Sequence, residues 1–401
     1  MRRLYALLLA TAVVFALGAP LPVRAAQATG DPVEIPTVLT ITGTAAFLGS
    51  AESQALTLIE NNVNKNGGIQ GRPVKFKIYD EASNPTIAVQ IVTQALAASK
   101  SPVFIGPVLQ ASCNATAPLF KQGPVAFCIA PSDFPESGGY RFSANASTDD
   151  GALLAVRYLR LRGLKRIALI TATDAAGQVL DKSFAAAFAA PENKDMIETV
   201  HEHFNYSDLS VAAQIARVKA SNPQVLIGWA TGTPLATLLH GYRDAGMDIP
   251  FVTGSGTMVY AQMEQYKQIM PKELLFPGLQ PALLAPDASG ATSRDPVRRA
   301  QALYVDSFKS INVRPDFAQI LIWDAATLAV DVLRHVGPNA TPQQARDYLA
   351  TVHDWAGANG MYDFRGGKQR GVGVNAVAMD RWDVDKDAFV AVSNAGGQPL
   401  K

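Results

Sequence analysis

Excess charge, long apolar runs and cysteine are all scarce in this sequence. The 401 residues include 35 Lys and Arg against 34 Asp and Glu, which leaves no basic surplus for a nucleic-acid or membrane surface. Beyond residue 26, no apolar stretch approaches the roughly 20 residues that a membrane-spanning helix needs. The apolar residues, 48% of the chain, occur in short periodic runs, which indicates a folded protein, and the length suits two domains.

The first 26 residues have the layout of a secretory signal. Two arginines precede an apolar run over Leu4–Leu17, and small residues follow it up to Ala26. We predict residues 1–25 to be a signal peptide, with cleavage after Ala25 or Ala26 and export to a bacterial periplasm. A membrane anchor is the less favoured alternative, because the apolar run is short for a bilayer span.

The two cysteines, Cys113 and Cys128, are predicted to form a disulfide. In an oxidising compartment, two cysteines pair more often than they stay free. Cys113 opens a predicted helix and Cys128 lies near the end of the next predicted strand, Val125–Ile129, so their Cα atoms are expected to be neighbours. The alternatives are two buried free thiols, or half of a metal site.

A strand that ends at a helix occurs twice in the chain. Val103–Ile105 reads as a buried strand, a Gly-Pro pair ends it, and a helix is predicted over Ser112–Lys121 with Ser112 as its cap. The segments ASKSPVFIG and ASNPQVLIG are alike, and the second predicts a strand over Val225–Ile227 that Gly228 closes. Two similar halves indicate a cleft, where N–H groups at helix starts favour an anionic or polar ligand group.

Strands and helices alternate along both halves, which predicts an α/β fold of doubly wound parallel sheets covered on both faces. In the first half, a strand is expected over Val38–Ile41, a small-residue loop over Thr42–Gly49 and a helix over Ser50–Asn66. The segment Leu279–Leu284 is expected to return to the first domain, because three more helices follow it. Val374–Trp382 and the next apolar segment are predicted to form a final hairpin.

The sequence offers no convincing set of residues for catalysis or metal binding. The triplet Gly254-Ser255-Gly256 lacks the glycine two residues before the serine that a hydrolase elbow needs. His201 and His203 share one face of a predicted strand, but no third ligand is near them in the sequence, which favours an exposed polar face over a metal site. We therefore predict a binding protein with no catalytic residues, no metal and no cofactor.

Several segments together resemble the periplasmic substrate-binding proteins of ABC importers, of the leucine/isoleucine/valine-binding type. The resemblance covers essentially the whole chain after residue 26, and its most specific part is the GGI-x-G segment with its downstream partners in order. The matching motifs are Asn64–Gly71 (NKNGGIQG), Asp80, Asn84-Pro85, Ile105-Gly106-Pro107, Tyr242–Gly246 (YRDAG) and Tyr362–Gly367 (YDFRGG).

The resemblance implies two α/β lobes joined by three crossovers that form a hinge, with a ligand cleft between the lobes. Lobe 1 is expected over residues 33–146 and 284–366, and lobe 2 over 147–283 and 367–395. Closure on a small-molecule ligand requires that the ligand bind the closed state better than the open one. The implied partner is the membrane permease of an ABC importer. We expect a monomer that binds no nucleic acid.

The resemblance also carries the ligand contacts of the family onto both lobes. These ligand-binding positions are Phe47, Leu48, Gln110, Ala111, Ser112, Ser132, Asp133, Ala176, Trp229, Thr231 and Ser255. Phe47 and Leu48 fall in the first-lobe loop that lines the ligand's side chain. The aromatic positions of the second lobe fall near Ala176 and Thr231, with Trp229 close by.

Two of these positions depart from the pattern of the family. Gln110 stands where a serine usually holds the ligand carboxylate, with Ser112 two residues further on, and Ser255 stands where an acidic residue holds an amino acid's ammonium group. A buried ammonium without a carboxylate partner is costly, so an amino acid is disfavoured unless Asp133 takes over. We expect a small organic acid, aromatic ones included, or a polar neutral compound. The alternatives are branched-chain or other amino acids, or a role as ligand-sensing partner of a membrane receptor.

Overall fold

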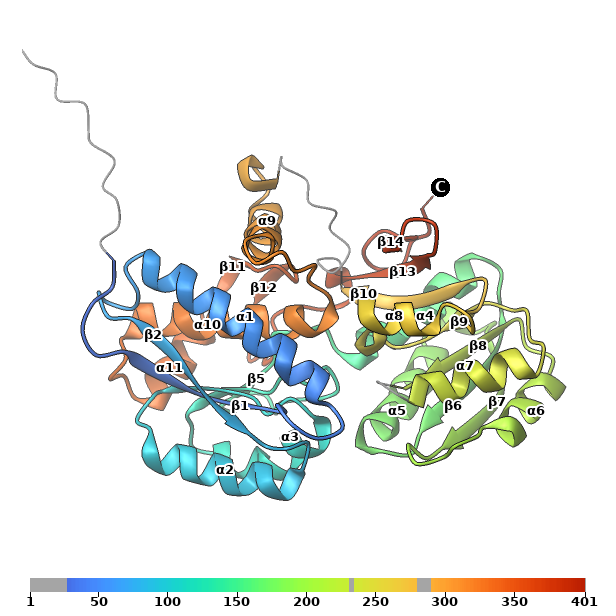
Figure 1. Ribbon diagram of the computed structural model, residues 1–401, viewed down its shortest axis with the longest axis horizontal. Helices are drawn as coiled ribbons and strands as arrows, with labels where there is room; N and C mark the ends of the chain where they lie inside the picture. The colour runs from blue at the N-terminus through green and yellow to red at the C-terminus, as the bar shows by residue number, and fades with distance from the viewer. Residues whose placement is uncertain (1–26, 231–233, 280–289, 401) are drawn as a thin grey trace, which may run out of the picture.

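Two β-sheets lie side by side in the structure, a computed structural model that describes residues 27–230, 234–279 and 290–400 (Figure 1). The first sheet has five parallel strands in the order β2-β1-β3-β4-β5. Its strands are β1 (Val33–Leu39), β2 (Val74–Asp80), β3 (Val103–Ile105), β4 (Val125–Phe127) and β5 (Arg141–Phe142).

The second sheet has seven strands in the order β14-β13-β10-β9-β8-β6-β7. They are β6 (Arg166–Ala172), β7 (Ile197–Phe204), β8 (Val225–Trp229), β9 (Phe251–Val252), β10 (Leu274–Leu279), β13 (Val377–Asp383) and β14 (Ala388–Ala391). The strands from β6 to β10 are parallel, whereas β13 pairs antiparallel with β10 and β14. The predicted final hairpin is therefore confirmed, as is the α/β fold with two parallel-sheet lobes.

Apolar residues of the first sheet point alternately to its two faces. The helices of this lobe are α1 (Ala46–Lys65), α2 (Pro85–Ala98), α3 (Gln110–Thr116), α9 (Pro296–Lys309), α10 (Phe317–Val336) and α11 (Pro342–Leu349), beside a small antiparallel pair, β11 (His353–Ala356) and β12 (Met361–Asp363). On one face, Val38 and Phe104 pack with Val92 of α2. On the other, Leu39 and Ile105 pack in the core that includes α1 and α10. Burial on both faces explains the continuous apolar run of β3.

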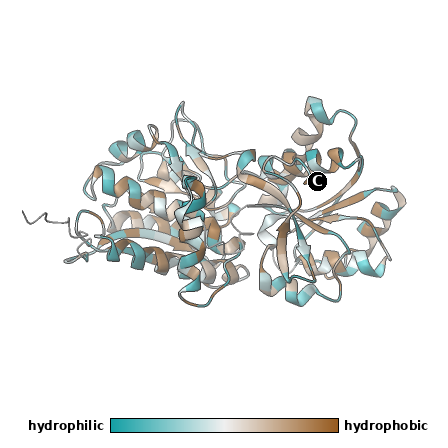
Figure 2. Cartoon of the chain, turned by 90° about the horizontal axis from the view of Figure 1, so that it is seen from above, coloured by the Kyte–Doolittle hydropathy of each residue, from teal (hydrophilic) through white to brown (hydrophobic). Residues whose placement is uncertain are grey.

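The second lobe repeats this layered arrangement. Its helices are α4 (Thr148–Leu161), α5 (Ala175–Ala189), α6 (Ala212–Ala220), α7 (Pro234–Asp244) and α8 (Tyr260–Tyr266). Leu169 and Ile227 pack with α4 and α5 on one face, and Ile170 and Leu226 pack with α6, α7 and α8 on the other. Figure 2 shows hydrophobic residues along the central strands and hydrophilic ones on the outer helices. Among the described residues, no helix combines the length and apolar character needed to cross a membrane.

The chain passes between the sheets after β5, after β10 and after β12. It enters α4 first, then returns to α9 and α10 beside α1, and finally enters β13. Leu279, which was expected to begin the return to the first lobe, is the last residue of β10 and pairs with Val377. The return therefore follows Leu279, and residues 280–284 of the predicted segment lie outside the described residues. The lobe boundaries stay a prediction.

The first strand begins earlier than the sequence predicted. β1 covers Val33–Leu39 and includes Pro36, whereas the prediction was Val38–Ile41. β3 pairs with β1 only at Thr37. The first half of β1 therefore has a free edge on that side, where a proline without an N–H group is tolerated.

The loop predicted over Thr42–Gly49 is also shorter in the structure, because α1 begins at Ala46. The residue before the helix, Ala45, has no side chain that caps α1. Instead, its N–H donates to the Ser83 hydroxyl oxygen at 3.2 Å. The donor at this helix start is thus satisfied by a residue that is distant in sequence, which a local pattern does not reveal.

The helix predicted over Ser112–Lys121 is α3 over Gln110–Thr116, followed by a 3-10 turn over Ala117–Phe120. Ser112 is the third residue of α3 and does not cap it, because the residue at the N-cap is Leu109. The α-helix ends just before the residue that precedes Pro118, as helices before prolines usually do.

Gly228 does not close its strand, since β8 continues to Trp229. A Cβ atom on Gly228 would lie 2.3 Å from Cζ of Phe251. The glycine is therefore required by the close packing of a ring from the neighbouring strand, and it is not a chain break.

The predicted disulfide between Cys113 and Cys128 is present. The two Cα atoms are 6.1 Å apart, and the residues are 15 positions apart in sequence. Both residues are buried. The bond joins the middle of α3 to the segment that follows β4, and it thereby fixes two elements at the carboxyl edge of the first sheet.

Candidate functional site

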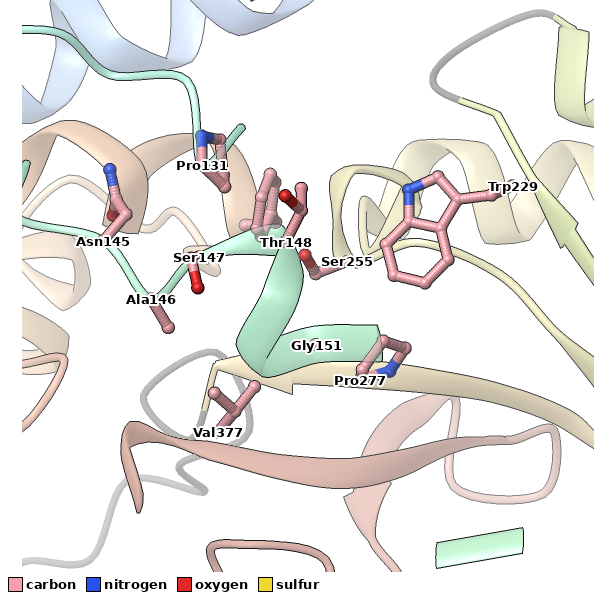
Figure 3. Close-up of a pocket in the computed structure, with 11 residues that line it drawn as sticks. Pro131, Asn145, Ala146, Ser147, Thr148, Gly151, Trp229, Ser255, Pro277 and Val377 are labelled. Atoms are coloured by element: carbon pink, nitrogen blue, oxygen red, sulfur yellow. The ribbon is translucent and has the colours of Figure 1, made fainter. Parts of the chain in front are cut away.

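A pocket opens where the two lobes meet (Figure 3). Its empty volume is about 360 Å³, part of which is open to solvent. The lining residues come from both lobes and are Pro131, Asn145, Ala146, Ser147, Thr148, Gly151, Trp229, Ser255, Pro277, Phe317 and Val377. None of these side chains carries a charge. The pocket therefore offers hydroxyl groups, one amide and apolar surface to a ligand.

Two of the predicted ligand contacts, Trp229 and Ser255, line this pocket from the second lobe. Trp229 is the last residue of β8, and Ser255 begins a 3-10 turn that follows β9. These strands are parallel neighbours, and open α/β sheets bind their ligands outside the carboxyl ends of such strands. The alternating fold thus brings together two residues that are 26 positions apart.

Gly254 and Phe184 hold the Trp229 indole in place. A Cβ atom on Gly254 would lie 2.4 Å from Nε1 of Trp229, so the ring rests directly against the glycine backbone. The indole also meets the Phe184 ring edge to face, with the ring centroids 5.7 Å apart. Such a ring pair contributes about 0.5–1.5 kcal/mol beyond its buried area. The largest side chain of the pocket is therefore fixed in orientation.

The first turn of α4 forms another wall of the pocket. Ser147 caps the helix by accepting from the N–H of Asp150 at 3.1 Å, and the Asp150 carboxylate accepts from the N–H of Ser147 at 2.9 Å. The adjacent Asp149 carboxylate accepts from the Ser183 hydroxyl at 2.6 Å. Both carboxylates beside the pocket therefore already have donors from the protein.

A half-buried arginine, Arg370, connects the loops around the pocket. Its guanidinium donates to Ser143 Oγ at 2.9 Å, to the Pro131 carbonyl at 3.3 Å, and to the carbonyl oxygens of Asn145 and Asp133. Burial lowers the pKa of Arg370, while nearby carboxylates oppose that effect. Because Pro131 and Asn145 line the pocket, Arg370 sets the position of two of its walls. The sequence analysis missed this residue, since a lone arginine after a glycine-rich stretch gives no local signal.

Comparison with known proteins identifies the family. The profile of the periplasmic binding protein family matches residues 32–388. The chain belongs to the periplasmic binding protein family. This result confirms the predicted resemblance, and membership in a family of binding proteins supports the prediction that the chain is not an enzyme.

Individual relatives of this periplasmic binding protein are similar at low sequence identity. A Pseudomonas aeruginosa protein named as an amino acid binding protein is 22% identical over 225 residues, which are 54% of this chain and 59% of the relative's length. An extracellular ligand-binding receptor from Rhodopseudomonas palustris superposes with a TM-score of 0.76 at 21% identity, covering 90% of this chain and 100% of that one. The branched-chain amino acid transporter substrate-binding protein of Streptococcus pneumoniae, in complex with isoleucine, gives 0.71 at 17% identity, with 90% and 98% covered. The structural matches show a shared fold.

On the first lobe of this periplasmic binding protein, the predicted residues Gln110 and Ser132 contact each other. The Ser132 hydroxyl donates to Oε1 of Gln110 at 2.7 Å, and Nε2 of Gln110 donates to Oδ1 of Asn114 at 2.7 Å. Gln110 is 7% exposed and Ser132 is 5% exposed. The neighbouring Ala111 is exposed at the start of α3. Pro131, the residue before Ser132, lines the pocket, whereas Gln110, Ala111 and Ser132 do not.

One oxygen of Asp133, the residue offered as a substitute for the missing acidic residue, already has a partner inside the first lobe. Its carboxylate is almost completely buried and lies 3.1 Å from Nη1 of Arg141. Burial raises the pKa of Asp133, while the charges of Arg141 and Arg370 act in the opposite direction. An ion pair inside the lobe therefore occupies the carboxylate that the sequence offered as an ammonium partner.

Ser112 lies inside the first lobe beside two buried glutamates. It is fully buried, as are Glu52 of α1 and Glu81 after β2. Burial raises the pKa of Glu81 to about 7. The nearby Ser112 hydroxyl and Val108 N–H act to lower this pKa. Neither group forms a hydrogen bond to the carboxyl oxygens of Glu81. The Ser112 side chain therefore faces the interior of the lobe, at a distance from the lining of the pocket.

The remaining predicted contacts are dispersed. Leu48 belongs to the core of the first lobe, and Phe47 packs against that core from the first turn of α1, so neither lies in a loop. Ala176 is half-buried in the first turn of α5, a helix that approaches α3 across the two lobes. Thr231 lies outside the described residues. The pocket thus brings together only Trp229 and Ser255 from the predicted set.

The prediction that His201 and His203 lack a third ligand is wrong. Asp181, which lies on α5, is close to both imidazoles, and the three residues place their ligand atoms within 4.8 Å of one another. The pairing of a helix residue with a strand residue depends on how α5 packs over β6 and β7. A search of the neighbouring sequence therefore did not find it.

Proposed function

We propose that this periplasmic binding protein captures a small solute between its lobes and delivers it to an ABC importer. The observation that carries the proposal is the pocket at the carboxyl ends of β8 and β9, which has walls from both lobes. A ligand in this position contacts the segments through which the chain passes between the sheets. It can therefore bind a closed arrangement of the lobes better than an open one, as ligand-driven closure requires.

An amino acid is the first ligand class that we propose. Two of the similar proteins are named for amino acid binding, and one of them was solved with isoleucine bound. These comparisons favour the amino-acid alternative over the organic acid that the sequence favoured. The apolar surface of Trp229, Pro277 and Phe317 suits an aliphatic or aromatic side chain. The hydroxyl groups of Thr148 and Ser255 suit a carboxylate, whereas the Ser147 hydroxyl already donates to Asp150.

A solute without an ammonium group is the second candidate, because one observation favours it. Among the residues that the structure describes, no carboxylate lines the pocket, and Asp133, Asp149 and Asp150 already have partners. A buried ammonium would depend on neutral acceptors alone, which costs affinity.

Matched pairs of solutes separate the two candidates. Isothermal calorimetry would compare L-leucine with 4-methyl-2-oxopentanoate, and L-phenylalanine with phenylpyruvate. Within each pair, the solutes differ only in an amino or a keto group. Stronger binding of the amino acids supports the first candidate, and stronger binding of the keto acids supports the second. If none of these solutes, nor benzoate, binds or raises the melting temperature, both ligand assignments are wrong.

The remaining parts of the proposal concern the export and assembly of the chain. We propose that residues 1–25 are removed on export to the periplasm, that the mature chain is a monomer, and that its partner is the membrane permease of the importer. Mass spectrometry of the exported protein tests the cleavage after Ala25 or Ala26. Sedimentation tests the oligomeric state. Capture of the mature chain by vesicles that contain the permease tests the partner.

A further inference from the structure

Two histidines and an aspartate converge on the second lobe, away from the pocket. His201 and His203 lie on β7, the edge strand of the second sheet, and Asp181 lies on α5. Nε2 of His201 is 3.1 Å from Oδ1 of Asp181, and Nε2 of His203 is 3.0 Å from Oδ2 of the same carboxylate. The three ligand atoms lie within 4.8 Å of one another.

We propose that Asp181, His201 and His203 form a binding site for one divalent transition-metal ion of the zinc class. Two ligands of one tetrahedral zinc ion, with bonds of about 2.0–2.1 Å, are roughly 3.3 Å apart. The two nitrogen–oxygen separations are already close to this value. The two separations involve different oxygens of Asp181, so the ion either takes both oxygens of the carboxylate or requires a small rotation of that group. The gap between the two imidazoles must also narrow, which a rotation of the exposed His203 side chain can achieve.

Neighbouring side chains already orient two of the three ligands. The Thr171 hydroxyl donates to Oδ1 of Asp181 at 2.6 Å and lies 3.0 Å from Nε2 of His201. On the other side of the same imidazole, Oε1 of Glu198 lies 3.6 Å from Nδ1 of His201. A carboxylate at the second ring nitrogen fixes the orientation of a metal-binding histidine and strengthens its bond to the metal.

Charge and exposure also suit an ion at this place. With neutral imidazoles, Asp181 and Glu198 leave two negative charges beside the two rings. The side chain of His203 is 45% exposed, that of Asp181 30% and that of His201 19%, so an ion can enter from solvent and keep a water as its fourth ligand. The donor set of two imidazoles and one carboxylate is one that zinc accepts, and copper and nickel compete for the same donors.

Calorimetric titration of the tag-free mature chain with Zn²⁺ tests this proposal. We expect one ion to bind per chain, and we expect Asp181→Asn and His203→Ala each to weaken binding at least tenfold. His240→Ala is the matched control, because His240 is an exposed histidine of the same lobe. It should bind Zn²⁺ as the unaltered chain does. Circular dichroism and melting of the metal-free variants establish that each one is folded.

The alternative is that Asp181 only accepts hydrogen bonds from the two imidazoles. In that case, Zn²⁺ does not bind, or it binds equally well to the His201→Ala/His203→Ala double variant, and either result overturns the proposal. Binding that is lost in His203→Ala but unchanged in Asp181→Asn also overturns the three-ligand site. Titration with Co²⁺ gives an independent readout, because a tetrahedral Co²⁺ site has intense visible absorption. That absorption should be absent in Asp181→Asn.

Discussion

The Trp229 indole and the Gly254 backbone are in direct contact, so close that a methyl group on Gly254 would lie 2.4 Å from Nε1 of Trp229. Trp229 ends β8, and Gly254 follows β9 just before Ser255. Two parallel neighbouring strands thus set the direction of the largest side chain in the pocket. The contact is therefore part of the packing of the second lobe, and it also fixes a side chain that lines the pocket.

We expect Gly254→Ala to displace the indole. The φ angle of Gly254 is −71°, which alanine adopts without strain, so any effect comes from the steric clash. Whichever of the matched solutes above binds the natural chain should bind the variant at least tenfold more weakly. The free energy of unfolding should fall by about 1–3 kcal/mol, as is typical of overpacking. Tryptophan fluorescence, calorimetry and urea unfolding measure these three changes.

Gly151→Ala is the control for this substitution. A Cβ atom on Gly151 would lie 3.7 Å from Cη2 of Trp229, an ordinary van der Waals contact, and the residue lies within α4. Alanine is favoured over glycine inside a helix by about 0.5–1 kcal/mol. The melting temperature should therefore stay the same or rise. An equal loss of stability in both variants would show that the close contact at Gly254 is not the cause.

The sequence was sufficient to predict the alternating architecture, because each strand and helix carries its own apolar pattern. From the sequence we expect a helix over Phe317–Val336 and a strand near Ile197–Phe204. α10 and β7 have these bounds. The start of α1 could not be predicted in the same way. It depends on a hydrogen bond to Ser83, and only the packing of α1 beside β2 brings that residue close.

The site was less predictable than the fold, because most of its contacts join residues that are distant in the sequence. Trp229 and Ser255 were predicted from the family resemblance, which places ligand contacts at or after the ends of strands, and both line the pocket. The ion pair between Asp133 and Arg141 could not be predicted, because the position of β5 brings Arg141 to that carboxylate. Asp181 and Arg370 act through contacts with distant segments, and nothing beside them in the sequence indicates those contacts.

Arg370→Met should destabilise the region around the pocket. Methionine keeps much of the apolar stem, but it removes the donors to Pro131, Asn145 and Asp133. The Pro131 carbonyl keeps the Thr148 N–H as a donor at 3.3 Å, and the Asn145 carbonyl keeps the Ser143 hydroxyl at 3.5 Å. A buried polar group left without a donor, as the Asp133 carbonyl would be, costs about 1–3 kcal/mol, so a loss of about that size is expected in urea unfolding. Arg365→Met is the control. Arg365 forms an exposed pair with Asp363, and solvent screening leaves such pairs with little effect on stability. Similar losses in both variants would contradict the role of Arg370.

Removal of the disulfide should lower stability by a predictable amount. Cys113 and Cys128 close a loop of 15 positions, for which the chain-entropy account gives about 3 kcal/mol. Cys113→Ser/Cys128→Ser and the reduced natural chain should both show this loss in urea unfolding. The double variant should not respond to reductant. A natural chain whose midpoint is the same with and without reductant would show that the bond does not stabilise the fold.

The buried carboxyl groups of Glu52 and Glu81 should make the protein less stable as pH rises. Burial raises the pKa of Glu81 from 4.5 to about 7, and burial together with the nearby Glu81 raises the pKa of Glu52 well above 4.5. The folded state therefore keeps protons that the unfolded state releases. The contribution of these groups to the free energy of unfolding is therefore highest below about pH 4.5, where both carboxyl groups are protonated in the folded and the unfolded state. It falls as pH rises through about 7, because the unfolded state releases these protons first.

Glu81→Gln tests this dependence, because glutamine keeps the size of the side chain and cannot ionise. The shift from 4.5 to about 7 corresponds to at most roughly 3 kcal/mol, so the variant should be more stable than the natural chain at about pH 8 by up to that amount. At about pH 4 both forms of the protein carry a neutral group at this position, and the difference should vanish. Other buried acids, such as Asp324, whose pKa burial raises to about 6, act in both proteins and cancel in the comparison. Urea unfolding of the two proteins at several pH values measures the difference, and a difference that is constant with pH would mean that Glu81 ionises normally inside the lobe.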